Sequence, residues 1–191
     1  MTAVEFAGSE LLTRPGAVMV PRPASLALVE RALAHIGSEP AVIADVGTGS
    51  GAIAIAIAHA APNAVVWATD DSEEAVALAC RNAFHCDVAD RVHVRHGDLL
   101  EPVPGPIDVV VANLPYLPWA ERALHHDLDG EPEHAVFAPG DGLGGYRRLL
   151  ASARLRLQPE ALVAVQFRGH VLAARAGELA VLELELLERA A

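Results

Sequence analysis

The sequence has no lysine: all 14 of its basic residues are arginine, against 25 aspartates and glutamates. The formal net charge is therefore −11 at pH 7. Sequence-independent binding of nucleic acid needs many cationic side chains against the phosphates. The charge balance therefore disfavours nucleic acid as the main partner, although it permits a local basic patch.

Aromatic residues are also scarce, at 4% of 191 residues, although 52% of the chain is hydrophobic. The core must therefore consist mainly of Ala, Val, Leu and Ile. No apolar run approaches the roughly 18 residues that a membrane-spanning helix needs. The start of the chain carries Glu5 and Glu10 and no basic segment, unlike a secretory signal. We expect a cytoplasmic protein, in which the two cysteines, Cys80 and Cys86, are small buried or half-buried side chains.

Apolar strand-like runs alternate with helical runs, which is typical of an α/β fold with a mostly parallel sheet. The pattern predicts strands over 41–46, 64–69, 91–95, 107–112, 161–167 and 179–187. It predicts helices over 24–36, 52–60, 72–84, 143–157 and 170–178, and an irregular segment over 114–140. We expect one Rossmann-like, doubly wound domain over residues 1–191, with 1–20 as an N-terminal extension.

Two details of the helices depend on local chemistry. Ile and Ala alternate over 52–60, as they would in a strand. Because Ala is the best helix former and a glycine turn after a strand usually leads into a helix, we predict a helix there. Asp71, with Glu74 three residues later, is the predicted cap of the following helix.

The first chemical signal is a glycine-rich loop after the strand 41–46. The loop contains Gly47, Thr48, Gly49 and Gly51. Glycines let the backbone turn sharply and approach a ligand closely. The same spacing fits the dinucleotide pattern G-x-G-x-x-A. The glycines alone therefore leave three possibilities open: a site for S-adenosylmethionine (SAM), a nicotinamide or flavin site, or a tight turn that binds nothing.

Acidic residues beside the loop favour SAM as the cofactor. Asp45 precedes the first glycine, where a carboxylate suits the sulfonium and ammonium groups of SAM and repels a pyrophosphate. Asp70 ends the next strand and can accept hydrogen bonds from two ribose hydroxyls, although a helix cap is the alternative. Asp98 and Leu99 follow the third strand, and Asp98 is a candidate acceptor for the adenine amino group. A Gly-Asp turn without a ligand is the alternative there.

The second signal is the tetrapeptide Asn113-Leu114-Pro115-Tyr116 at the end of the strand 107–112, where ligands of open α/β sheets bind. An amide or aryl-amine nitrogen is a poor nucleophile and carries two N–H donors. The Asn113 side-chain oxygen and the Leu114 carbonyl can accept both hydrogens and stabilise the charge that develops on methylation. Pro115 stiffens the turn, and Tyr116 can pack on a flat acceptor group. These four residues are the candidate catalytic residues, an ordinary proline turn being the alternative.

With these motifs the chain resembles the HemK/PrmC family of protein-glutamine N5-methyltransferases, which modify release factors. The matching segments are Val20 to Pro23, Ala44 to Ala54, Ala68 to Asp70, Gly97 to Leu99, Asn113 to Tyr116, Glu131-Pro132 and Asp141 to Leu143. The resemblance implies a class I SAM-dependent methyltransferase fold and a protein substrate, with a peptide-chain release factor as the first candidate. It places Asp45, Gly47, Gly49, Asp70, Asp98 and Asn113 at the cofactor site, and Asn113 and Tyr116 against the substrate.

The chain departs from the family pattern at three points. Leu114 stands where the family usually has proline, and Asn-Leu-Pro-Tyr is the form seen in rRNA adenine N6-dimethyltransferases. The helical domain that docks the release factor in bacterial members does not precede the match. Of the two antiparallel strands that usually end class I enzymes, only one can be placed, so we expect a sheet truncated at the C-terminal strands.

Two further clusters have plain interpretations. The histidines and acids of the irregular segment form a polar lid rather than a metal site, because their spacing matches no metal motif. These residues are His125, His126, Asp127, Asp129, Glu131, Glu133 and His134. A solvated helix face accounts for Arg147, Arg148, Arg154 and Arg156.

Methylation of a protein glutamine is the leading hypothesis. Leu114 motivates a second, methylation of adenine N6 in nucleic acid. A small-molecule methyltransferase whose segment 117–140 closes over its pocket is a third, and a SAM-binding module without activity is a fourth. The tetrapeptide argues against a nicotinamide-dependent oxidoreductase. The sequence does not specify an oligomeric state.

Overall fold

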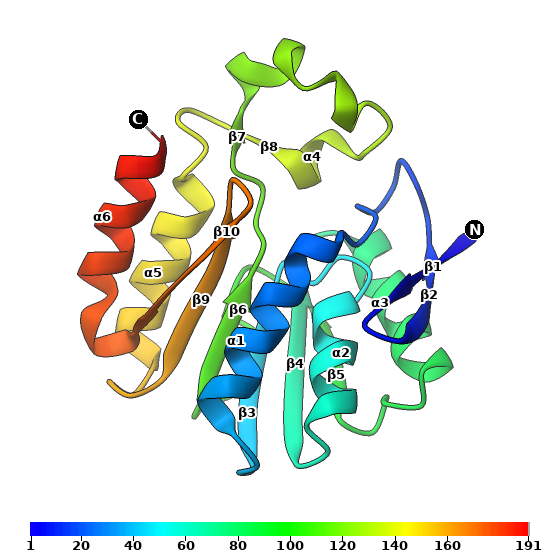
Figure 1. Cartoon of the computed structure of the whole chain (residues 1–191), viewed down its shortest axis with the longest axis vertical. Coiled ribbons are helices and arrows are strands. Elements are labelled where there is room, and N and C mark those ends of the chain that lie inside the picture. Colours follow the sequence, from blue (N-terminus) through cyan, green and yellow to red (C-terminus); the bar gives the residue numbers. More distant parts are fainter. Residues whose placement is uncertain (191) are drawn as a thin grey trace.

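The computed structural model describes residues 1–190, and a six-stranded sheet forms its centre (Figure 1). The strand order is β10-β9-β6-β3-β4-β5, and all pairs are parallel except β9 with β10. The strands are β3 (Ala41–Val46), β4 (Ala64–Asp70), β5 (Val92–His96), β6 (Val109–Ala112), β9 (Leu162–Phe167) and β10 (His170–Arg175). The expected doubly wound, mostly parallel α/β sheet is confirmed.

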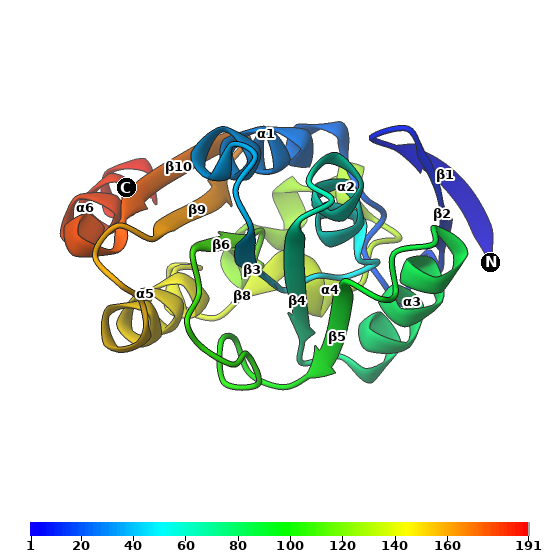
Figure 2. The same cartoon turned by 90° about the horizontal axis from the view of Figure 1, so that it is seen from below.

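Helices cover both faces of the sheet, as the view from below shows (Figure 2). One face carries α1 (Leu26–Ile36), α2 (Ala52–Ala60) and α3 (Glu73–His85), and the other carries α5 (Gly144–Arg156) and α6 (Leu179–Ala190). Successive strand residues alternate between the two cores, so that Ile43 belongs to the first and Ala44 to the second. Because both faces are covered, the central strands are apolar throughout. Within residues 1–190, no helix is long and apolar enough to span a membrane.

The alternating Ile and Ala residues form a helix, as predicted. Every residue from Ala52 to Ala58 is buried in α2. This helix lies against β4 and is flanked by α1 and α3, so that almost no side of it meets water. Burial on all sides explains why its sequence lacks the usual polar stripe.

Two predictions near the C-terminus were wrong. The segment predicted as a helix over 170–178 contains β10, which pairs with β9 through a two-residue turn. Arg168 and Gly169 form that turn with φ angles of 47° and 81°, a conformation that suits the twist of a hairpin. The segment predicted as a strand over 179–187 lies in α6, which buries Leu179, Leu182 and Leu186 at helical spacing.

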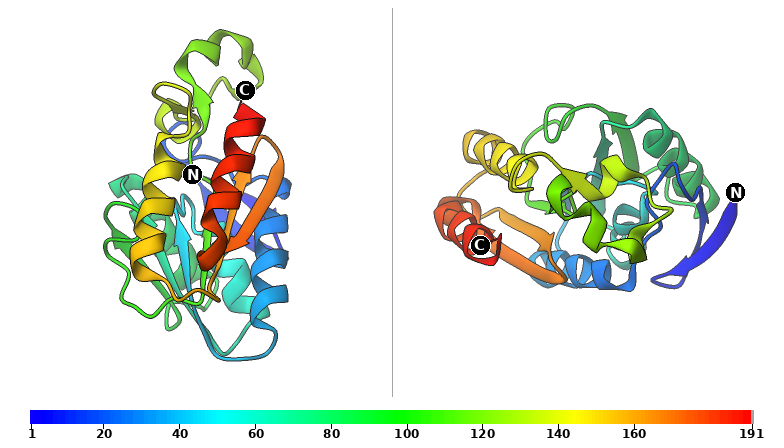
Figure 3. Two further views of the ribbon diagram at one scale, coloured as in Figure 1. Left: turned by 90° about the vertical axis from the view of Figure 1, so that its left-hand side faces the viewer. Right: turned by 90° about the horizontal axis from the view of Figure 1, so that it is seen from above.

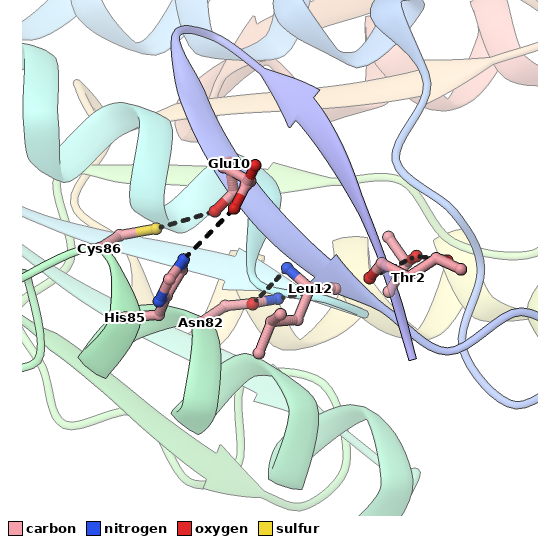
Figure 4. A network of polar contacts seen from close by, with 7 residues as sticks. Thr2, Glu10, Leu12, Asn82, His85 and Cys86 are labelled. Carbon is pink, nitrogen blue, oxygen red and sulfur yellow. Dashed lines mark hydrogen bonds and ion pairs between the residues drawn. The ribbon is translucent and has the colours of Figure 1, made fainter.

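Residues 1–20, which we expected only as an extension, include a β-hairpin that packs on α3 (Figure 4). The hairpin pairs β1 (Thr2–Phe6) with β2 (Ser9–Thr13). The fully buried Asn82 side chain makes both backbone hydrogen bonds of Leu12, as a neighbouring strand would. Its Oδ1 accepts from Leu12 N–H at 2.8 Å, and its Nδ2 donates to Leu12 O at 3.0 Å. The same Nδ2 donates to the Ser50 carbonyl at 2.8 Å. Asn82 thus connects the hairpin to the glycine loop.

The start of α3 differs from the prediction in its cap. The Ser72 hydroxyl, not Asp71, caps the helix and accepts a hydrogen bond from Ala75 N–H at 3.3 Å. Ser72 directly precedes the first helical residue, whereas Asp71 lies one residue too early to reach it. Cys80 and Cys86 lie on and just after α3, as expected, and both are free thiols. Cys86 is half-buried, but Cys80 is exposed because it points away from the sheet-facing side of the helix.

The segment after β6 forms a lid over the carboxyl ends of the strands (Figures 1 and 3). It is not wholly irregular, because it contains β7 (Leu117–Pro118), the short helices η2 (Trp119–Leu124), η3 (His126–Leu128) and α4 (Glu133–Val136), and β8 (Phe137–Ala138). Strands β7 and β8 pair in parallel. Within the lid, Arg122 pairs with Glu133 at 2.7 Å and with Asp129 at 3.4 Å. Across residues 1–190, no three His, Cys, Asp or Glu side chains are grouped so that they could hold a metal ion.

Candidate active site

A cavity of about 220 Å³ lies between the lid and the ends of β3, β4, β5 and β6. The N-terminal segment 17–22 forms one wall, and the lid residues His134 and Ala135 form another. Most residues expected at a cofactor site line the cavity: Gly47, Thr48, Gly49, Asp70, Asp98, Leu99 and Asn113. Asp45 and Gly51 are not among its lining residues. The structure therefore brings together segments that are widely separated in the sequence.

The glycine loop is held tightly against the sheet. The N–H groups of Gly47 and Thr48 both donate to the Thr69 carbonyl at 2.9 Å. Gly47 has a φ of 71°, and a Cβ there would lie 2.9 Å from the Leu114 side chain. The positive φ favours glycine, and a larger residue would also have to displace the Leu114 side chain. The loop and the tetrapeptide therefore lie side by side.

Asp45 lies behind the loop, fully buried, rather than on the cavity surface. Its Oδ2 accepts hydrogen bonds from the Thr48 hydroxyl at 2.6 Å and from Ala54 N–H at 3.1 Å. Its Oδ1 has no partner among the described residues. Burial raises the pKa of this carboxyl to about 6. Asp45 thus fixes the loop and the first turn of α2, and its charge can reach a cavity ligand only through the loop.

Asp70 faces the cavity at the end of β4 and also supports the loop. Its Oδ2 accepts from Gly49 N–H at 2.9 Å, and its Oδ1 accepts from Ser72 N–H at 3.0 Å. Each carboxylate oxygen can accept more than one hydrogen bond, so both keep capacity for a ligand. Burial raises the pKa of Asp70, against the effect of these two backbone donors.

Asp98 pairs with the Arg148 guanidinium of α5, and both residues line the cavity. Next to them, Leu99 has a φ of 48°, and its carbonyl accepts from the Thr69 hydroxyl at 2.8 Å. Three of the α5 arginines, Arg147, Arg148 and Arg154, are exposed, as expected of a solvated face, although each of the four also contacts a specific partner. Arg147 pairs with Asp141 at 2.6 Å, Arg154 pairs with Glu183 at 2.6 Å, and Arg156 donates to the carbonyls of Leu100 and Val103.

The tetrapeptide contributes three of its residues to the cavity, Asn113, Leu114 and Pro115. Tyr116 does not line it. The Tyr116 ring packs instead on Phe167 at 5.1 Å between centroids, and burial raises the pKa of its hydroxyl. In this structure Tyr116 therefore lies beside the cavity, under the lid.

Two contacts account for the motifs Asp141 to Leu143 and Glu131-Pro132. Gly142 lies against the tetrapeptide: its φ is 82°, and a Cβ there would fall 2.0 Å from the Tyr116 carbonyl oxygen. Glu131 of the lid accepts a hydrogen bond from Val20 N–H at 3.1 Å and pairs with Arg22 at 3.5 Å. The lid is thus fastened to the N-terminal wall of the cavity.

Three buried polar residues beside the tetrapeptide escaped the sequence analysis: Ser25, Tyr146 and Gln166. The Tyr146 hydroxyl lies 2.5 Å from the Gln166 carbonyl and 3.2 Å from the Leu114 carbonyl. The one available signal was a glutamine within the otherwise apolar strand β9. A buried polar side chain needs a hydrogen-bond partner, and such partners often belong to a site.

The charges around the cavity fit a cationic cofactor better than a pyrophosphate. Asp70 faces the cavity, whereas the guanidinium groups of Arg22 and Arg148 are each paired with a carboxylate. A positively charged ligand such as SAM would meet net negative charge here, and a pyrophosphate would be repelled.

Comparisons with known proteins agree with this site. Residues 23–126 match the family model described as methyltransferase small domain. The chain is 40% identical over 159 residues to a release factor glutamine methyltransferase of Gloeobacter violaceus, covering 78% of this chain and 54% of that protein. It is 41% identical over 165 residues to a release factor glutamine methyltransferase of Moorella thermoacetica, covering 85% of this chain and 58% of that protein. The resemblance inferred from the motifs is confirmed, and the chain spans about half the length of these relatives.

Solved structures share the fold at lower sequence identity. The hMettl16 catalytic domain, in complex with MAT2A 3′UTR hairpin 6, has a TM-score of 0.69 at 18% identity, covering 93% of this chain and 66% of that one. A ribosomal protein L11 methylase from Lactobacillus delbrueckii subsp. bulgaricus has a TM-score of 0.56 at 22% identity, covering 90% of this chain and 70% of that one. These likenesses establish the class I methyltransferase fold.

Proposed function

Because the chain belongs to the methyltransferase small domain family, we propose that it transfers a methyl group from SAM to the side-chain amide nitrogen of a protein glutamine. The observation that carries the proposal is the shared cavity of the glycine loop and the tetrapeptide. Since Gly47, Leu114 and Asn113 line the same cavity, a cofactor on the loop and an acceptor nitrogen beside Asn113 would be neighbours. Proximity of this kind supplies much of the catalytic advantage in group transfer.

In this proposal the cofactor rests on the backbone of Gly47, Thr48 and Gly49. Asp70 receives its ribose hydroxyls, and Asp98 and Leu99 contact its adenine. Asp45 and Gly51 act indirectly, since Asp45 anchors the loop and Gly51 lies where α2 begins. When bound, SAM supplies an electrophilic methyl group on a positively charged sulfur.

Asn113 and Leu114 would hold the acceptor. The Asn113 side-chain oxygen and the Leu114 carbonyl each accept one hydrogen of the amide, which directs the nitrogen lone pair into the cavity. Both oxygens also stabilise the positive charge that builds up on nitrogen. Pro115 keeps the turn rigid, and Tyr116 borders the acceptor. No strong base is required, because nitrogen becomes acidic as its new bond to carbon forms and its proton can pass to water.

A peptide-chain release factor is the first substrate to test, because the relatives that share 40% and 41% identity carry that name. Leu114 supports one other candidate, adenine N6 in nucleic acid. Against it stand the net charge of −11 and the pairing of Arg22 and Arg148 with carboxylates at the cavity. Such pairing leaves these guanidinium groups less able to bind phosphates.

The test uses the purified chain with methyl-labelled SAM and three acceptors in parallel. These are a release factor with its Gly-Gly-Gln loop, the same factor with that glutamine replaced by alanine, and total RNA. Label on the first factor alone is the expected result. Label on RNA would move the assignment to adenine, and label on both factors would place the methyl group at another side chain.

A further inference from the structure

Two buried side chains, Ser25 and Gln166, continue a chain of hydrogen bonds from Asn113, and Ser25 also lines the cavity. The Asn113 Nδ2 is 3.4 Å from the Ser25 Oγ, and the Ser25 hydroxyl donates to Gln166 Oε1 at 2.9 Å. Ser25 is 5% exposed and Gln166 is 6% exposed, so the contact between them is shielded from water. Ser25 directly precedes α1, Asn113 directly follows β6, and Gln166 lies near the end of β9.

The direction of these hydrogen bonds matters, because a serine hydroxyl has one proton. When Ser25 gives that proton to Gln166, only its lone pairs remain for Asn113. A lone pair can receive the Asn113 N–H but repels the Asn113 oxygen. With the Gln166 oxygen toward Ser25, the Asn113 amide therefore turns its nitrogen toward Ser25, which leaves its oxygen for an acceptor. Sterics alone do not choose between these orientations, since the two ends of an amide are nearly equal in size.

The Ser25 hydroxyl is not used to cap α1. Ser25 ends the short helix η1 (Pro23–Ser25), which runs directly into α1, and its own backbone is helical, with φ −74° and ψ −11°. A capping serine has an extended backbone, and the Ser25 side chain makes no capping bond. The hydroxyl is directed to Gln166 and Asn113 instead.

We propose that Ser25 and Gln166 are positioning residues that hold the Asn113 amide with its oxygen toward the methyl acceptor. The inference rests on the proposed function, in which Asn113 must accept a hydrogen from the substrate amide. A reversed Asn113 would present N–H donors to the N–H donors of the substrate. Turnover then falls, whereas cofactor binding is preserved, because it depends mainly on the glycine loop, Asp70 and Asp98 in the proposed function.

The kinetic test compares Ser25→Ala, Ser25→Thr and Gln166→Met in the full chain. Loss of one orienting hydrogen bond is expected to lower kcat about tenfold in Ser25→Ala and Gln166→Met. Their dissociation constants for S-adenosylhomocysteine should stay within about twofold of the wild-type value, because the bonds removed join Ser25 to Gln166 and Asn113 and not to the cofactor. Ser25→Thr keeps the hydroxyl and should recover most of the turnover. Wild-type kcat in Ser25→Ala or Gln166→Met would refute the proposal, as would a loss in Ser25→Thr equal to that in Ser25→Ala.

A second measurement needs no methyl acceptor. In NMR spectra of the ¹⁵N-labelled chain with S-adenosylhomocysteine, the Asn113 side-chain NH₂ should show a cross-peak to the Ser25 Hβ protons. The cross-peak should weaken in Gln166→Met, because the freed Ser25 proton allows the amide to turn. If the wild-type chain methylates no glutamine but gives this pattern, the proposed function fails while the orienting network stands. Absence of the wild-type cross-peak overturns the network whatever the activity.

Discussion

Replacement of Asn82 by alanine tests how the N-terminal hairpin is attached to the domain. The fully buried Asn82 side chain makes hydrogen bonds of 2.8 and 3.0 Å to the Leu12 backbone and of 2.8 Å to the Ser50 carbonyl. Each contributes about 1 kcal/mol, so Asn82→Ala should lower the free energy of unfolding by about 3 kcal/mol. Because Leu12 is only half-buried, water can partly replace two of these bonds, and the sum is an upper limit.

Urea denaturation measures this free energy, and a thermal melt should show a fall in Tm of about 6–12 °C for a domain of this size. Asn63→Ala is the matched control, because its single side-chain hydrogen bond, to the Ser38 carbonyl at 3.4 Å, is exposed. The control should change stability by less than about 0.5 kcal/mol. Equal, small effects of both variants would show that Asn82 does not anchor the hairpin. Since Ser50 belongs to the glycine loop, Asn82→Ala should also weaken S-adenosylhomocysteine binding in a calorimetric titration.

Four other variants test the site directly. Asn113→Ala should leave S-adenosylhomocysteine binding intact and reduce turnover about hundredfold, because an oxygen that stabilises the reacting nitrogen is lost. Asp70→Ala should weaken cofactor binding by about 2 kcal/mol in calorimetry, and unchanged affinity would contradict the ribose assignment. Burial raises the pKa of Asp45 from 3.8 to about 6. The unfolded chain therefore loses this proton first, and native stability falls by about 3 kcal/mol as pH rises from about 4 to about 6, then levels off. Asp45→Asn should remove that fall in urea titrations. Gly142→Ala would place a Cβ 2.0 Å from the Tyr116 carbonyl oxygen and should lower both Tm and turnover; an unchanged melt would show that the turn can relax.

The sequence predicted those elements whose local signals agreed with their surroundings. The alternating Ile and Ala of α2 were assigned correctly because a glycine turn after a strand set the context. The alternating Leu and Glu near Glu183 and Glu185 had no such context, and they were mistaken for a strand although they lie in α6. A helix needs only a few buried residues at helical spacing: Leu182 and Leu186 are buried and Leu184 between them is exposed, so the period-two pattern was not informative. The turn at Arg168 and Gly169 was the missed clue, because it commits the following residues to pair with β9.

The lining of the candidate site was predictable where one short segment supplies several of its residues. The glycine loop and the tetrapeptide each follow a strand, and parallel strands end at the same edge of a sheet. The network around Asn113 was not predictable, because Ser25 and Gln166 are 141 positions apart and neither belongs to a distinctive motif. Asp45 is the converse case: its motif was recognised from the sequence, but only the structure shows that its side chain is buried behind the loop and does not line the cavity.

The N-terminal segment is the part of the chain whose role the sequence analysis underestimated most. As a sequence it is an extension without a motif before Val20; in the structure residues 17–22 line the cavity. Asn82 holds the segment at Leu12, and Glu131 of the lid holds it at Val20. Asn82 also donates to Ser50 of the glycine loop, and Glu131 also pairs with Arg22. Because one segment makes both contacts, it joins the glycine loop to the lid through the hydrogen bonds of Leu12 and Val20.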